Sequence, residues 1–101
     1  MKYYAGIGSR ETPFDIELLM TEIASFLGDH SWVLRSGGAK GADSAFELGA
    51  KSFNYKREIF KAEDCTKEAS ELSSKYHPNW KACSDFAKKL HGRNAMILLW
   101  K

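Results

Sequence analysis

The sequence lacks the features that mark secreted, membrane-spanning and metal-binding proteins. It has only two cysteines, Cys65 and Cys83, and no CxxC motif, HExxH motif or other paired Cys/His set. No apolar run approaches the roughly 18 residues that a membrane-spanning helix needs. The first residues also lack the apolar stretch of about 7–15 residues that a signal peptide carries. We therefore expect a cytoplasmic protein with free thiols, no metal site and no cofactor.

An excess of one charge is missing as well. The chain has 15 Lys and Arg against 13 Asp and Glu, which gives a net charge of +2. This balance argues against a protein that coats duplex nucleic acid, although it permits a local basic pocket. With 101 residues, no internal repeat and no Pro/Gly/Ser-rich linker, the chain is expected to form a single domain over residues 1–101.

What the sequence does contain is an alternation of strand-like and helix-like segments. β-branched, aromatic and apolar runs predict strands at 2–7, 32–36 and, more weakly, 57–60. Helices are expected from residue 13 to about 27, from residue 42, and over 79–94. The polar stretch 61–80 is expected to be a loop with one or two helical turns. The last six residues either continue the final helix or form an edge strand.

Alternation of this kind predicts an α/β fold. Strand–helix units joined by right-handed crossovers give a Rossmann-like, three-layer domain with a small, mainly parallel sheet of three or four strands. The first helix has an apolar stripe with helical spacing, which is expected to face the core. The stripe comprises Ile16, Leu19, Met20, Ile23, Ala24 and Leu27.

The first glycine-rich turn follows the first predicted strand. Gly6 and Gly8 let a ligand approach the main chain, and Ser9 and Arg10 add a hydroxyl and a guanidinium group. Thr12 is expected to cap the following helix, with Pro13 as its first residue. Because a helix start carries about half a positive charge, this turn is a candidate anion site. The alternative is a tight strand–helix turn with Arg10 in solvent.

A second glycine-rich turn follows the second strand and opens another helix. It is neither a Walker A loop nor a GxGxxG fingerprint, but it offers backbone amides, a helix start and a cation to a phosphate. Asp43 is expected either to cap this helix or to accept a hydrogen bond from a sugar hydroxyl. The candidate ligand-binding residues of the turn are Ser36, Gly37, Gly38, Lys40, Gly41 and Asp43. Ligands of open parallel sheets bind at the carboxyl ends of strands, where both turns fall.

The remaining candidate residues have plainer interpretations. Glu47 lies one helical turn after Asp43 and is either a carboxylate facing the ligand crevice or a solvated surface residue. His30 and His77 are interpreted as solvated turn and loop residues. His91 is the only histidine that we would place near a site.

Three segments together resemble a known superfamily. YAGIGSRETP at 4–13, LRSGGAKGADSAFELGA at 34–50 and LHGRNAM at 90–96 are similar to the SLOG superfamily. That superfamily joins the DNA-processing protein A (DprA) Rossmann domain with the lonely-guy (LOG) phosphoribohydrolases. The chain looks most like the short phage and bacterial members, and HPNW at 77–80 lies where this subgroup has a similar loop.

The resemblance implies a nucleotide-type ligand over the two glycine turns. Carried over residue by residue, it implies that Gly8, Ser9 and Arg10 contact the ligand from the first turn, together with the six residues of the second turn. It also implies that Arg93 corresponds to the active-site arginine of LOG enzymes.

The sequence departs from the LOG enzymes at one important motif. The PGGxGTxxE segment, whose glycines bind phosphate and whose glutamate assists glycosidic cleavage, is not found in residues 1–101. We therefore expect a natural minimal member, a C-terminally truncated chain, or half of a site completed by another subunit. The expected function is binding of a nucleotide or a nucleotide-derived small molecule, as a sensor, carrier or sequestering protein. The alternatives are a LOG-like phosphoribohydrolase, with Arg93 and Glu47 as catalytic residues, and a DprA-like protein that binds single-stranded DNA.

Self-association is also expected. A small parallel sheet leaves an open edge, and the apolar tail Met96–Trp100 would gain from being covered. The sequence therefore predicts a homo-oligomer that pairs through this tail.

Overall fold

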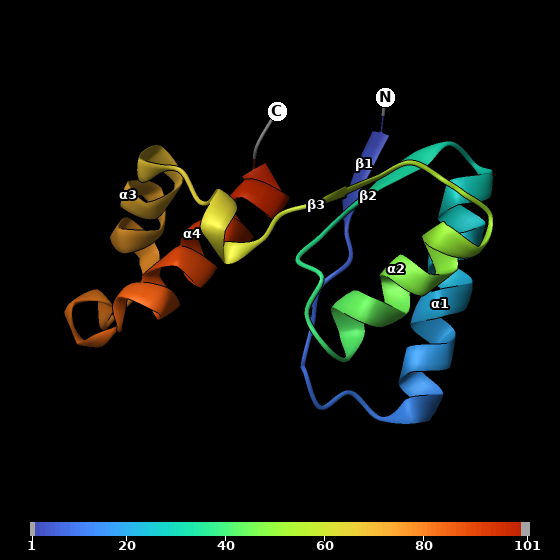
Figure 1. Ribbon diagram of the computed structural model, residues 1–101, viewed down its shortest axis with the longest axis horizontal. Coiled ribbons are helices and arrows are strands. Elements are labelled where there is room, and N and C mark those ends of the chain that lie inside the picture. The colour runs from blue at the N-terminus through green and yellow to red at the C-terminus, as the bar shows by residue number, and fades with distance from the viewer. Residues whose placement is uncertain (1, 100–101) are drawn as a thin grey trace. The chain divides into compact units, whose positions relative to one another are not determined.

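A computed structural model describes residues 2–99 (Figure 1). The chain forms two compact units, unit 1 (Met1–Ile59) and unit 2 (Phe60–Lys101). The expectation of one domain over 1–101 stays a prediction. Within the described residues, no helix is both long and apolar enough to cross a bilayer. Both cysteines are free thiols, as predicted.

Unit 1 has an α/β, Rossmann-like fold, which confirms the predicted class. Its elements are β1 (Lys2–Ala5), α1 (Phe14–Asp29), β2 (Trp32–Ser36), α2 (Ala42–Ser52) and β3 (Arg57–Ile59). The three strands form one parallel sheet in the order β1-β2-β3. Ala5 pairs with Arg35, and Ser36 pairs with Ile59, so the carboxyl ends of β1 and β2 lie side by side.

Helices α1 and α2 pack against each other beside this sheet (Figure 1). The rings of Tyr4 on β1 and Phe46 on α2 meet edge to face at 6.4 Å. Leu34 of β2 is fully buried. The Thr21 hydroxyl of α1 donates to the Ala45 carbonyl of α2 at 2.9 Å, which ties the helices together.

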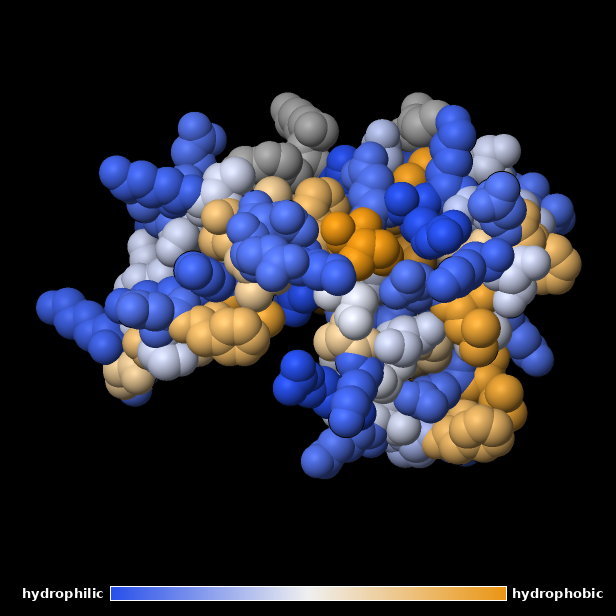
Figure 2. Space-filling model, in the orientation of Figure 1, coloured by the Kyte–Doolittle hydropathy of each residue, from blue (hydrophilic) through white to orange (hydrophobic). Residues whose placement is uncertain are grey.

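The predicted core stripe of α1 is wrong in its extent. Of its six residues only Ala24 is buried, whereas 51% of Leu19 is exposed. The reason is that α1 approaches α2 closely, through small residues. A Cβ added at Gly49 would lie 2.8 Å from the Ala24 Cβ. Most contacts of α1 are with α2 and few are with the sheet, so apolar surface remains exposed over α1 (Figure 2).

The predicted end of the first strand and the predicted cap of the first helix were also wrong. β1 ends at Ala5 rather than at residue 7, and α1 begins at Phe14 with Pro13 as its N-cap. The Thr12 hydroxyl does not cap the helix, because it donates to the Ser9 carbonyl at 2.6 Å. β2 matches its predicted bounds.

Unit 2 is helical. It contains the 3-10 turn η1 (Ala62–Asp64), α3 (Lys67–Tyr76), the 3-10 turn η2 (Trp80–Ala82) and α4 (Asp85–Leu99). The segment 61–80, predicted as a loop with one or two turns, thus holds a helix of 10 residues. α4 starts later than expected and continues through the apolar tail instead of forming an edge strand. Trp100 lies outside the described residues.

Candidate functional site

The two glycine-rich turns of unit 1 lie against each other. The backbone N–H of Ala42, the first residue of α2, donates to the Ser9 carbonyl at 3.0 Å. The Gly6 N–H donates to the Arg35 carbonyl at 2.9 Å. The structure therefore brings the predicted residues of both turns together at the carboxyl ends of β1 and β2.

Gly41 is the residue that permits this approach. It precedes α2 with φ +79°, a backbone conformation that residues with a Cβ rarely adopt. A Cβ at this position would also collide with the Ser9 carbonyl oxygen and lie 2.7 Å from the Arg10 carbonyl carbon. The close packing of the two turns therefore explains why residue 41 is a glycine.

Asp43 organises the second turn from inside. Its carboxylate is almost fully buried and accepts from the backbone N–H of Gly37 at 3.1 Å and of Ala39 at 3.5 Å. The predicted helix cap is wrong, because the N-cap of α2 is Gly41 and no side chain caps the helix. A carboxylate thus already occupies two amides that the sequence offered to a phosphate.

Ser36 has a similar internal role. It is fully buried, and its hydroxyl donates to the Gly6 carbonyl at 2.6 Å. This bond fixes the end of β1 to the end of β2. In the described conformation the Ser36 side chain holds the two turns together and is closed to a ligand in solvent.

The first turn and the start of α2 carry hydrogen-bond donors that have no acceptor within residues 2–99. Ser9 accepts from the Glu11 N–H through its hydroxyl oxygen at 3.0 Å, which leaves the hydroxyl proton available. Arg10 and Lys40 are exposed, and neither has an ion-pair partner among residues 2–99. Within the same residues, several backbone N–H groups donate to no protein group: those of Gly8, Ser9, Arg10, Asp43 and Ser44.

A small cavity lies beside one of these donors, Ser44. It measures about 180 Å³, and Gly41 and Ser44 at the start of α2 form part of its lining. Phe14, the first residue of α1, also lines it with 74% of its surface exposed. Leu18 and Leu48 add apolar surface to its wall, and Glu17, Thr21 and Ala45 complete the lining. Phe14 was not among the sequence candidates, and its place directly after Pro13 was the signal that could have indicated it.

The two proposed catalytic residues are placed differently. Glu47 is half-buried on α2, and its side chain makes no hydrogen bond within residues 2–99. Arg93 belongs to unit 2 and is buried, with 8% of its surface exposed. Its Nε donates to the Asn94 Oδ1 at 2.9 Å and its Nη1 to the Phe60 carbonyl at 3.2 Å. The guanidinium group is thus engaged in holding the start of unit 2 to α4.

Comparison of the chain with protein-family models, curated proteins and solved structures gave no match. The SLOG resemblance therefore stays a prediction, and the function is argued from the site alone.

Proposed function

We propose that unit 1 binds a nucleotide or a nucleotide-derived small molecule. Its phosphate would lie on the two glycine-rich turns where they touch each other. One observation carries this proposal: within residues 2–99, the two turns that touch each other carry backbone N–H groups without a protein acceptor and two cations without an ion-pair partner, Arg10 and Lys40. Backbone amides at helix starts, combined with Arg and Lys, form a common anion-binding arrangement in proteins.

The proposal divides the sequence candidates into two groups. Gly8, Ser9, Arg10 and Lys40 are exposed and would contact the phosphate. Asp43 and Ser36 would instead shape the turns, because their polar atoms are buried and bonded to the protein. Phosphate recognition would thus depend on the first turn and the start of α2 more than on the Gly37 and Ala39 amides.

The nucleoside part would occupy the cavity beside Gly41 and Ser44. Phe14 offers an exposed aromatic face on which a base can stack, a contact worth about 1–3 kcal/mol. This places the apolar and charged parts of the ligand on adjoining surfaces of unit 1.

The test is calorimetric titration of the whole chain with nucleoside mono- and diphosphates, ADP-ribose, cyclic nucleotides and inorganic phosphate. A hydrogen bond to a charged group contributes about 1.5–3 kcal/mol. Arg10→Gln and Lys40→Gln should therefore each weaken binding by about 10–100-fold. Lys51→Gln is the matched control, because Lys51 is an exposed cation near the other end of α2.

Two further readouts separate the alternatives. Release of free base from a nucleoside monophosphate would indicate a phosphoribohydrolase. Affinity that rises with oligonucleotide length and falls steeply with salt would indicate a single-stranded DNA-binding protein. Binding of none of these compounds, or binding that is equal in all three variants, would contradict the proposal.

A further inference from the structure

We propose a transition-metal site in unit 2, formed by His77, Cys83 and His91. One ligand atom from each of the three residues lies within 4.8 Å of the other two. Two imidazoles and a thiolate are the donor set that Zn²⁺ and related metals prefer. This site does not depend on the proposed nucleotide site, which belongs to unit 1.

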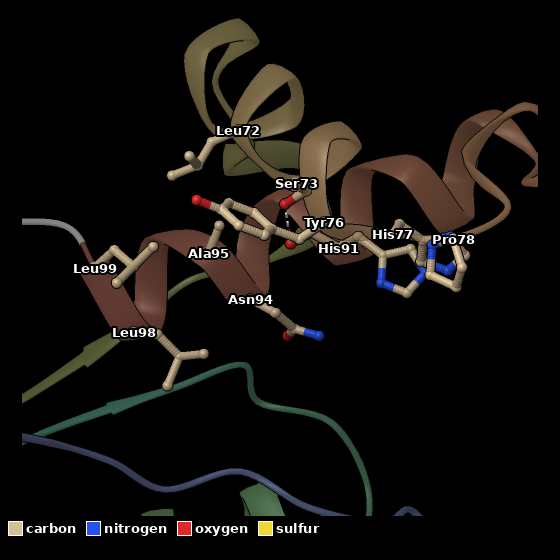
Figure 3. A pocket seen from close by; sticks show the side chains of 10 residues that line it. All are labelled: Leu72, Ser73, Tyr76, His77, Pro78, His91, Asn94, Ala95, Leu98 and Leu99. Carbon is tan, nitrogen blue, oxygen red and sulfur yellow. Dashed lines mark hydrogen bonds between the residues drawn. The ribbon is translucent and has the colours of Figure 1, made fainter.

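The three residues converge because of how unit 2 folds. His77 directly follows α3, and Cys83 directly follows η2, so both lie in the connection to α4. His91 lies on α4, and side chains on a helix tilt toward its N-terminus, which here is the end that the connection enters. The Ser73 hydroxyl donates to the His91 carbonyl at 2.9 Å and so fixes α3 to α4 beside the site (Figure 3).

The distances need little adjustment to hold an ion. Zn²⁺ bonds nitrogen and sulfur at about 2.0–2.3 Å, so tetrahedral donors lie about 3.3–3.7 Å apart. The His77 Nε2 is 3.9 Å from the Cys83 Sγ, and the centroids of the two histidine rings are 4.4 Å apart. No two ligand atoms of the group are more than 4.8 Å apart, so the widest pair would need to move closer by about 1 Å to bind an ion.

Metal binding would change the protonation of the group in a defined way. The Asn79 N–H donates to the His77 Nδ1 at 3.1 Å, so the proton of the neutral ring is on Nε2. Coordination through Nε2 would move this proton to Nδ1 and end the Asn79 contact. The Cys83 thiol would release its own proton to solvent on forming a thiolate bond.

Three protein ligands leave one position of a tetrahedral ion open. His77 and His91 also line a cavity of about 310 Å³ between α3 and α4. His77 and Pro78 lie at one end of this cavity and Leu99 at the other (Figure 3). Water or a ligand held in the cavity would therefore have access to the ion.

The chain provides its own matched controls, because it has only two cysteines and three histidines. Cys65 is the other thiol, and burial raises its pKa, which disfavours the thiolate that a metal needs. His30, in unit 1, bonds the Phe26 carbonyl through Nδ1 at 2.8 Å and is not part of the cluster found among the described residues. Cys65→Ser and His30→Gln should therefore leave metal binding unchanged.

The experiment is titration of the reduced, full-length chain with Co²⁺, followed by competition with Zn²⁺. We expect a thiolate-to-cobalt charge-transfer band that saturates at one ion per chain. Cys83→Ser should abolish the band. His77→Gln and His91→Gln should each weaken metal affinity by at least 10–100-fold, because that loss is typical even for residues that only hydrogen-bond to a metal ligand. Circular dichroism would verify folding, and the histidine variants carry the test if Cys83→Ser does not fold.

Two results would overturn the proposal. The first is the absence of a charge-transfer band in the wild-type chain at Co²⁺ concentrations well above those of the protein. The second is a band that survives Cys83→Ser or that disappears in Cys65→Ser. Neither result bears on nucleotide binding, so the two proposals can fail separately.

Discussion

At the scale of single residues, Asp43 has a structural role: its side chain bonds the backbone of the glycine-rich turn in which a ligand contact was expected. Its buried carboxylate supplies from within the chain the negative charge that the turn amides would otherwise seek from a ligand. Among the described residues 2–99, the first turn has no such internal acceptor for its Gly8, Ser9 and Arg10 amides. The two glycine-rich turns therefore differ in the backbone amides that they leave for a phosphate.

Asp43→Ala should destabilise unit 1 by about 1–3 kcal/mol, because it leaves the Gly37 and Ala39 amides without their acceptor. Asp43→Asn keeps one acceptor oxygen and should cost less. Urea unfolding measures both. Glu47→Ala, on the same helix, should stay within about 0.5 kcal/mol of the wild-type chain. Equal losses for Asp43→Ala and Glu47→Ala would contradict the assigned role.

Gly41→Ala should be more damaging than Gly38→Ala, although both glycines have positive φ. A strained backbone conformation of this kind costs about 1–3 kcal/mol for a residue with a Cβ. At Gly41 the added methyl also meets the backbone of the first turn, whereas at Gly38 the nearest atom is the Ile59 Cγ2 at 3.1 Å. Thermal unfolding of the two variants would compare the costs, and a smaller loss for Gly41→Ala would show that the turns do not touch as described.

At the scale of elements, the contact between β1 and α2 predicts a pH dependence. Burial against α2 raises the pKa of Tyr4 from its ordinary value of 10.0 to about 12. Above pH 10 the unfolded chain ionises this phenol while the folded chain keeps it neutral. Stability should therefore be intact below pH 10 and fall as the pH rises toward 12.

Urea unfolding at several values between pH 9 and pH 12 would measure this fall, which Tyr4→Phe should reduce. Tyr3→Phe is the control, because Tyr3 lies on the same strand with 40% of its surface exposed. An identical pH dependence in the wild-type chain and Tyr4→Phe would contradict the assignment to Tyr4.

An element was predictable from the sequence when most of its residues are apolar and buried. β2 is buried along most of its length, and its apolar run gave its bounds correctly. α3 buries only Ala69, so its polar sequence resembled a loop. The Thr66 hydroxyl, which accepts from the Ala69 N–H at 3.1 Å, was the cap signal that could have indicated the helix.

The candidate sites show the same limit. The glycine turns were predictable because their residues are contiguous in sequence and follow strands. The roles of Asp43 and Ser36 were not, because their partners depend on how the turns pack. The cluster of His77, Cys83 and His91 escaped prediction because its spacing matches no short metal-binding motif and its ligands meet only when α4 folds back on α3.

At the scale of the whole molecule, exposed apolar surface predicts self-association. Leu18 and Leu19 of α1 are each 51% exposed, and Leu98 and Leu99 of the tail are each 59% exposed. Exposed apolar patches of this kind are often covered by a partner. We expect sedimentation to show a dimer or larger species that the double replacement of either leucine pair by glutamine weakens. A monomer at high protein concentration would contradict this expectation.

Above all, we propose that a phosphate binds where the two glycine-rich turns of unit 1 touch each other. The most direct measurement is an amide-resolved NMR titration of the 101-residue chain with the tightest-binding nucleotide. We expect the largest shifts at Gly8, Ser9, Arg10, Asp43 and Ser44, with smaller ones at the cavity residues Phe14 and Leu48. Shifts confined to other residues, or no shifts at saturating nucleotide, would contradict it.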